Sequence, residues 1–105
     1  MTGSRIETFK TLVKKDPGNP LGRYSLANEY YKLEMYREAI NEIKEYLKIA
    51  DDQGAVYRML ADCYIRTGDA EMAREAYYEG IGAANRHGHP GMAEEYEEAI
   101  ELLNE

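Results

Sequence analysis

Two stretches of eight residues decide the fold of this chain: RYSLANEY at Arg23–Tyr30 and YRMLADCY at Tyr57–Tyr64. Both have Leu-Ala at the centre and end on tyrosine, and the second begins thirty-four positions after the first. The same offset pairs Ala39 with Ala73. Self-similarity at a fixed period of this length is typical of repeat proteins that stack copies of one helical unit.

Within each repeat the apolar residues recur at three- and four-residue spacing, as Leu26, Tyr30 and Leu33 do. That periodicity predicts helices with one apolar face. The connections between them are short, for example Thr67–Asp69, so successive helices are expected to pack antiparallel. Gly68 suits the left-handed conformation that ends many helices. Each repeat is therefore expected to be a hairpin of two helices.

Residues that start and stop helices divide the chain into six predicted helices. Asn19-Pro20 pairs an N-cap with proline at the first helical position, and Pro90 opens the last helix. Residues 85–89 are expected to form a break. The predicted helices are 5–15, 20–33, 36–49, 53–67, 70–84 and 90–103. We interpret residues 1–105 as one helical-repeat domain, with an N-terminal half-repeat helix at 5–15, repeat one at 20–53, repeat two at 54–87 and a C-terminal capping helix at 90–103.

The last predicted helix departs from the repeat, because the thirty-four-residue frame fails after residue 84. The segment 90–103 carries five glutamates around a thin apolar seam. An array of stacked units needs a polar outer surface on its terminal helix. The segment is therefore expected to be a solvating cap.

The repeat pattern resembles the tetratricopeptide repeat (TPR) family, whose signature is W-x2-L-G-x2-Y…A-x3-F…P over thirty-four residues. Here the first copy reads Arg23-x2-Leu26-Ala27-x2-Tyr30, followed by Ala39-x3-Ile43. The resemblance implies an all-α fold, a right-handed superhelical array of antiparallel helix hairpins. It also implies a concave groove, lined by the first helices of successive units, that receives a peptide or protein ligand.

On this resemblance, the candidate groove is the side of each first helix that does not carry the signature residues. Its side chains have no evident packing role in the repeat, and their mixture of aromatic, amide and guanidinium groups suits a peptide. Aromatic residues are frequent anchors, and arginine binds carboxylates bidentately. The candidate binding residues are Tyr24, Asn28, Tyr31 and Lys32 in repeat one, and Arg58, Met59, Asp62, Ile65 and Arg66 in repeat two.

The composition excludes several classes of partner. The formal net charge is −7, whereas nucleic-acid affinity depends on basic contacts to phosphate, so no nucleic-acid partner is expected. No run of eighteen apolar residues and no apolar secretory core are present, so no membrane partner is expected. The single cysteine, Cys63, cannot form an internal disulfide, which favours a reducing, cytoplasmic location.

The residues favour no catalytic chemistry. Phosphate-binding glycine loops, serine elbows and paired catalytic carboxylates are all missing from the sequence. His87 and His89 lack the further ligands that a zinc site requires, and a linker is the better interpretation. Cys63 has no neighbouring basic residue and histidine to activate it, and we interpret it as a small apolar residue. We therefore expect no enzyme, no cofactor and no metal.

The function expected from these residues is non-catalytic: a protein–protein interaction module, monomeric or weakly dimeric, that binds a peptide or protein segment. Two alternatives stay open. One is a self-associating scaffold, motivated by Phe9, Leu12 and Val13 on a half hairpin without its usual partner helix. The other is a segment of a larger protein whose activity lies elsewhere. A third hypothesis, metal-dependent chemistry at His87 and His89, belongs to a different class.

Overall fold

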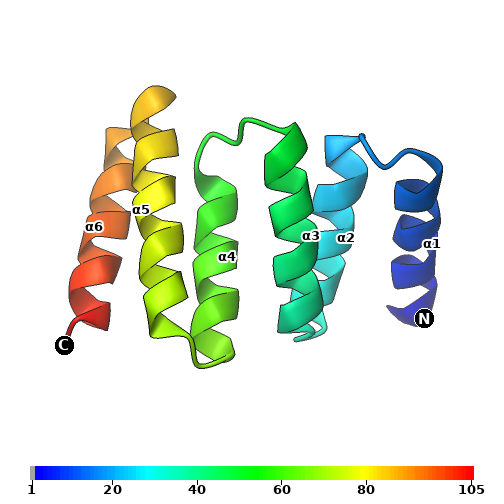
Figure 1. Cartoon of the computed structure of the whole chain (residues 1–105), viewed down its shortest axis with the longest axis horizontal. Coiled ribbons are helices and arrows are strands. Elements are labelled where there is room, and N and C mark those ends of the chain that lie inside the picture. Colours follow the sequence, from blue (N-terminus) through cyan, green and yellow to red (C-terminus); the bar gives the residue numbers. More distant parts are fainter. Residues whose placement is uncertain (1) are drawn as a thin grey trace. The chain divides into compact units, whose positions relative to one another are not determined.

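The computed structural model describes the backbone of residues 2–105 and the side chains from Arg5 onward (Figure 1). Over these residues the chain is all-α, with six helices and no strand, as expected. None of the described helices is long and apolar enough to span a bilayer. The helices are α1 (Thr2–Lys15), α2 (Pro20–Lys32), α3 (Tyr36–Ile49), α4 (Ala55–Arg66), α5 (Ala70–Arg86) and α6 (Pro90–Leu103).

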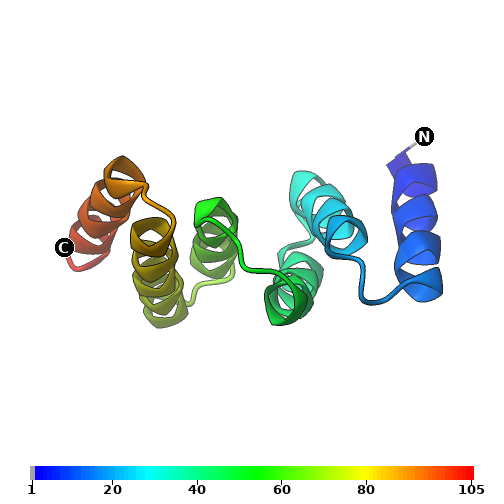
Figure 2. The ribbon, with the colours of Figure 1, turned by 90° about the horizontal axis from the view of Figure 1, so that it is seen from above.

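The helices form two compact units, Met1–Ala50 and Asp51–Glu105. In the first unit α2 packs against both α1 and α3. In the second unit α5 packs against both α4 and α6, and Figure 2 shows these three helices side by side. The division lies close to the expected junction of the two repeats at residues 53 and 54. Each unit therefore contains one complete hairpin, α2–α3 or α4–α5, and one further helix.

The first helices of the two hairpins bury the same positions of the repeat. Each buried residue of α4 lies thirty-four positions after a buried residue of α2, as Leu60 does after Leu26. The sequence period is thus also a period of burial. The buried residues are Gly22, Leu26, Ala27, Glu29 and Tyr30 in α2, and Val56, Leu60, Ala61, Cys63 and Tyr64 in α4.

Glu29 is the one charged residue that is buried among the described side chains. A buried carboxylate requires a compensating charge, and two cations supply it. The guanidinium of Arg5, from α1, lies 3.0 Å from the carboxylate, and the Lys32 ammonium lies 3.6 Å away. Together with the buried side chains of Ile6 and Val13, this ion pair holds α1 against α2.

Two residues after three of the helices end, the backbone is left-handed: at Glu34 (φ 60°) after α2, at Gly68 (φ 82°) after α4 and at Gly88 (φ 75°) after α5. This confirms the expected role of Gly68. Glu34 was not foreseen there, because a side chain at positive φ is strained and glycine is the usual choice. In each case the following N–H donates to a carbonyl of the last helical turn at 2.8 Å: Met35 to Tyr30, Asp69 to Tyr64, and His89 to Ala84.

Several predicted helix ends need correction. Helix α5 continues to Arg86 and leaves only residues 87–89 as a break, because no residue before Gly88 interrupts it. Helix α4 starts at Ala55 rather than 53, since the Asp52 carboxylate accepts from Gly54 N and Val56 N and caps the helix from outside. Helix α1 starts at residue 2, three residues before the predicted start, and α2 and α4 each end one residue early, at residues 32 and 66.

Gly80 lies at the closest approach of helices in the second unit. A Cβ atom at this position would lie 2.7 Å from the Tyr96 ring and 2.9 Å from Tyr57 Cβ. Tyr96, on α6, is almost fully buried, and its ring centroid lies 5.4 Å from that of Tyr77 on α5. The absence of a side chain at Gly80 therefore leaves the space that Tyr96 fills.

Gly80→Ala should lower stability even though alanine is the better helix former. The propensity gain is about 0.5–1 kcal/mol, whereas overpacking against Tyr96 and Tyr57 costs about 1–3 kcal/mol. Gly82→Ala is the matched control, because its Cβ would meet no atom closer than 3.6 Å, so it should raise stability. Urea denaturation of both variants measures the two effects. A stabilising Gly80→Ala would contradict the close approach.

Candidate binding face on the first helices

The candidate binding residues occupy matching positions on α2 and α4. We name them the α2 stripe (Tyr24, Asn28, Tyr31 and Lys32) and the α4 stripe (Arg58, Asp62, Ile65 and Arg66, with Met59 beside them). Each of the first four α4 residues lies thirty-four positions after its counterpart in the α2 stripe. All nine side chains are exposed or half-buried, so both helices leave this side accessible to solvent within their hairpins.

The tyrosines of the α2 stripe pack partly against α3. The ring centroids of Tyr24 and Tyr46 are 5.6 Å apart, and those of Tyr31 and Tyr36 are 6.0 Å apart with an edge-on orientation. The expectation that these residues have no packing role is therefore wrong for the tyrosines, because an aromatic side chain is long enough to reach across the hairpin. Tyr24 nevertheless keeps 36% of its surface exposed.

The polar members of the α2 stripe differ in their surroundings. Asn28 is half-buried between the two tyrosines in the helix sequence, whereas Lys32 is exposed. The Lys32 ammonium lies 3.6 Å from the Glu29 carboxylate. Since Arg5 pairs with the same carboxylate, Lys32 shares it and contributes positive charge at the end of the stripe.

In the α4 stripe, Arg58 is engaged by α6. Its guanidinium donates to Glu95 at 2.7 Å and lies 5.4 Å from the centroid of the Tyr96 ring. Arg58 was expected to bind the carboxylate of a ligand, and in the structure it binds a carboxylate of the chain itself. An exposed ion pair contributes only about 0–1 kcal/mol, so a ligand carboxylate could compete for it. The sequence analysis did not predict that Glu95 and Tyr96 contact Arg58, because it interpreted this segment as a solvating cap.

The remaining α4 residues give this stripe a different character from the α2 stripe. Arg66 Nε lies 3.6 Å from Asp62 Oδ1, an (i, i+4) pair with the acid on the N-terminal side. Ile65 keeps 40% of its surface exposed, and Met59 is half-buried. The α2 stripe is therefore mainly aromatic, and the α4 stripe is mainly charged with one exposed aliphatic side chain.

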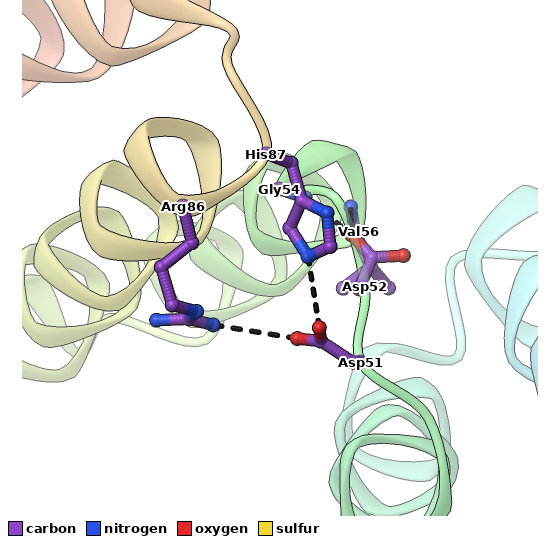
Figure 3. A network of polar contacts seen from close by, with 6 residues as sticks. All are labelled: Asp51, Asp52, Gly54, Val56, Arg86 and His87. Atoms are coloured by element: carbon purple, nitrogen blue, oxygen red, sulfur yellow. Dashed lines mark hydrogen bonds and ion pairs between the residues drawn. The ribbon is translucent and has the colours of Figure 1, made fainter.

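The two histidines join the connection before α4 to the connection after α5. His87 Nε2 lies 2.9 Å from Asp51 Oδ2, and Arg86 Nη2 lies 3.5 Å from Asp51 Oδ1. Figure 3 shows both side chains directed at the Asp51 carboxylate. Since a carboxylate only accepts, His87 carries the hydrogen on Nε2. His89 Nε2 lies 2.9 Å from Gln53 Oε1. Among the described side chains, no group of three or more His, Cys, Asp or Glu residues is placed to hold a metal ion.

Tyr96 ties α6 to the same connection. Its hydroxyl donates to the Gly54 carbonyl oxygen at 2.7 Å in a buried environment, and burial raises the pKa of this phenol above its ordinary value. The hydroxyl therefore remains a donor at any physiological pH. Gly54 itself has a φ of 124°, and a Cβ there would lie 2.8 Å from Met92 Sδ, so this turn requires glycine.

Tyr96→Phe should destabilise the protein by about 0.5–1.5 kcal/mol, because it removes one of the two donors to the Gly54 carbonyl while keeping the ring in place. The other donor is the Tyr57 N–H at 3.2 Å. Tyr78→Phe is the control, since Tyr78 is 57% exposed on α5. Guanidinium denaturation followed by circular dichroism gives both values. Equal effects of the two changes would show that the hydrogen bond contributes nothing.

Cys63 is fully buried in α4, in the place that Glu29 takes in α2. Burial, and secondarily the neighbouring Asp62 charge, raises the pKa of its thiol to about 11. The thiolate is the reactive form, so this environment disfavours nucleophilic chemistry. The sequence interpretation as a small apolar residue agrees with this burial.

Thiol modification provides a test of the Cys63 environment. From a pKa of 9.0 in the open chain to about 11 in the fold, the thiolate fraction at pH 8 falls about a hundredfold. Reaction with a disulfide reagent should therefore be at least that much slower for the folded protein than for the protein in guanidinium. Rapid reaction of the folded protein at pH 8 would contradict the buried position.

Comparison with known proteins bears on the fold alone. No family model matches the sequence, and no curated protein matches it. Among solved structures, the solution structure of protein BPP2914 from Bordetella parapertussis is similar, with a TM-score of 0.77 and 21% sequence identity. The match covers 94% of this chain and 86% of that one. Similarity at this identity supports the helical fold and says nothing about a ligand.

Proposed function

We propose that the chain is a TPR-like array of helix hairpins that binds a peptide or protein segment through the α2 and α4 stripes. The finer arrangement proposed is that of the family it resembles, a right-handed superhelix. In this proposal the chain has no catalytic role. The two stripes present the side chains that a ligand would contact.

One observation carries this proposal: three of the five buried positions are identical in the two hairpins, whereas none of the four matched stripe positions is. Leu26 and Leu60 match, as do the alanines and tyrosines of the buried set. At the stripe positions, a tyrosine in repeat one corresponds to an arginine in repeat two, and an asparagine corresponds to an aspartate. Burial constrains a residue through packing, whereas equal exposure with different chemistry is what selective recognition by each unit requires.

The chemistry of the stripes suits an extended peptide with an acidic residue. The half-exposed Tyr24 ring offers an apolar contact, the Asn28 amide offers both a donor and an acceptor to a peptide backbone, and Lys32 offers a positive charge. On α4 the exposed Ile65 and the Arg66–Asp62 pair extend the same combination of apolar and polar contacts.

Binding through the α2 stripe predicts that Tyr24→Ser weakens capture of a cellular partner by about tenfold or more, because exposed tyrosines are frequent hot spots. The matched control is Tyr78→Ser, an exposed tyrosine on the second helix of the other hairpin. Proteins retained from the native cell extract by each variant are quantified by mass spectrometry, and their affinities are then measured with purified partner.

A second arm tests the α4 stripe with Arg66→Ala. Arg58 is left unchanged, because its contacts with Glu95 and Tyr96 also hold α6. Circular dichroism must first show that the variants fold. If folded Tyr24→Ser and Arg66→Ala proteins retain their partners as well as Tyr78→Ser does, the stripes are not the binding surface and the proposal is wrong.

A further inference from the structure

The first and last helices carry opposite charge. Helix α1 contains four cations, Arg5, Lys10, Lys14 and Lys15, and one carboxylate, Glu7. Helix α6 contains five glutamates and no cation. The opposition is a property of these two helices and is not shared by the chain as a whole, whose net charge is −7.

Each of these helices also has a face that its own unit does not cover. In α1, Ile6 and Val13 are buried, while Leu12 keeps 48% of its surface exposed and Phe9 is half-buried. In α6, Ala93, Tyr96 and Ile100 are buried. The uncovered residues at helical spacing are Arg5, Phe9, Leu12 and Lys15 on α1, which we name the α1 face, and Glu94, Glu97, Glu98 and Glu101 on α6, which we name the α6 face.

The repeat register identifies the α1 face. Arg5, Phe9 and Leu12 lie thirty-four positions before Ala39, Ile43 and Tyr46 of α3. Ala39 and Ile43 are fully buried, and Tyr46 touches Tyr24 of α2. The α1 face is therefore the side with which a second helix packs against the first helix of its hairpin.

The α6 face matches the packing side of a first helix at one position. The buried Tyr96 and Ile100 lie thirty-six positions after Leu60 and Tyr64, so α6 repeats the burial pattern of a first helix with a shift of two residues. In that register Glu97 takes the place of the fully buried Ala61, whereas Glu94, Glu98 and Glu101 take the places of the exposed or half-buried Arg58, Asp62 and Ile65. Arg5 and Glu97 thus stand where the complete hairpins have buried alanines.

From these opposite charges we infer that α6 of one molecule packs beside α1 of a second copy. The occupant is a second copy because one chain supplies both faces, and the two faces carry opposite charge. The α1 face carries two cations, of which Arg5 already pairs with the buried Glu29, and the α6 face carries four carboxylates and no cation. The contact is heterologous, so it leads to head-to-tail oligomers and not to a closed dimer.

Salt discriminates this contact from general repulsion between two acidic chains. At about 0.1 M salt the Debye length is about 10 Å, so distant like charges are screened while touching opposite charges still attract. At about 1 M it is about 3 Å and the facing charges are weakened too. Local complementarity therefore predicts weaker association at high salt, whereas dominance of the net charge predicts the reverse.

The experiment is sedimentation of the whole chain at these two salt concentrations. The protein concentration is varied from about 10 μM to about 1 mM, a range that covers the dissociation constants of weak complexes. The average mass should rise with concentration at low salt, with an association constant about tenfold lower at high salt. A strict monomer throughout, or stronger association at high salt, would overturn the inference and leave the acidic face to a partner of another kind.

Charge reversal makes the test specific to the two faces. The α1-reversed variant is Leu12→Glu/Lys15→Glu, and the α6-reversed variant is Glu94→Lys/Glu97→Lys/Glu101→Lys. Arg5 is kept because it pairs with the buried Glu29. Each variant alone should stay monomeric, since its two faces then carry the same sign, and an equimolar mixture should associate again. A mixture that stays monomeric overturns the inference.

A matched control separates the faces from the change in net charge. Glu71→Lys/Glu75→Lys/Glu79→Lys alters three exposed glutamates of α5 and changes the net charge as much as the α6 reversal does. This control should associate at least as strongly as the unaltered protein. Loss of association in the control equal to that of the α6-reversed variant would contradict a contact through α6. Circular dichroism of every variant confirms that its helices are retained.

Discussion

The close approach of neighbouring helices is the constraint on which both units depend. Alanines 27, 39, 61 and 73 are all fully buried, which allows the helix backbones of each hairpin to come near one another. Larger residues such as Leu26 and Leu60 then fill the space around these contacts. Because the small residues recur at a fixed period, the two hairpins bury the same positions with different sequences between them.

In the second unit this constraint extends to a third helix. Helix α5 buries Ala76, Gly80 and Ala83, and the tyrosine of α6 occupies the space beside the glycine. That buried ring has two consequences outside the core. Its hydroxyl holds the turn before α4 through the Gly54 carbonyl, and its π-face lies under the Arg58 guanidinium. The packing of Tyr96 beside Gly80 therefore determines the surroundings of Arg58 on the candidate binding face.

The position of the candidate stripes follows from the repeat register, since exposure alternates with burial at helical spacing on both α2 and α4. The pairing of their side chains does not follow from it. The Tyr24–Tyr46 contact depends on how far a ring reaches across the hairpin. The Arg58–Glu95 pair could not be predicted from the repeat register. Helix α5 has 17 residues where α3 has 14, and this difference moves α6 out of the thirty-four-residue frame.

The sequence by itself determined the helical class, the six helices, the repeat period and most of the helix ends, since these depend on neighbours a few positions along the chain. Asn19, for example, caps α2 as its local pattern predicts. Only the tertiary structure decided which surface charges are already paired within the chain. Those pairs join residues far apart in sequence, as His87 joins Asp51, and they depend on interhelix distances that no local pattern encodes.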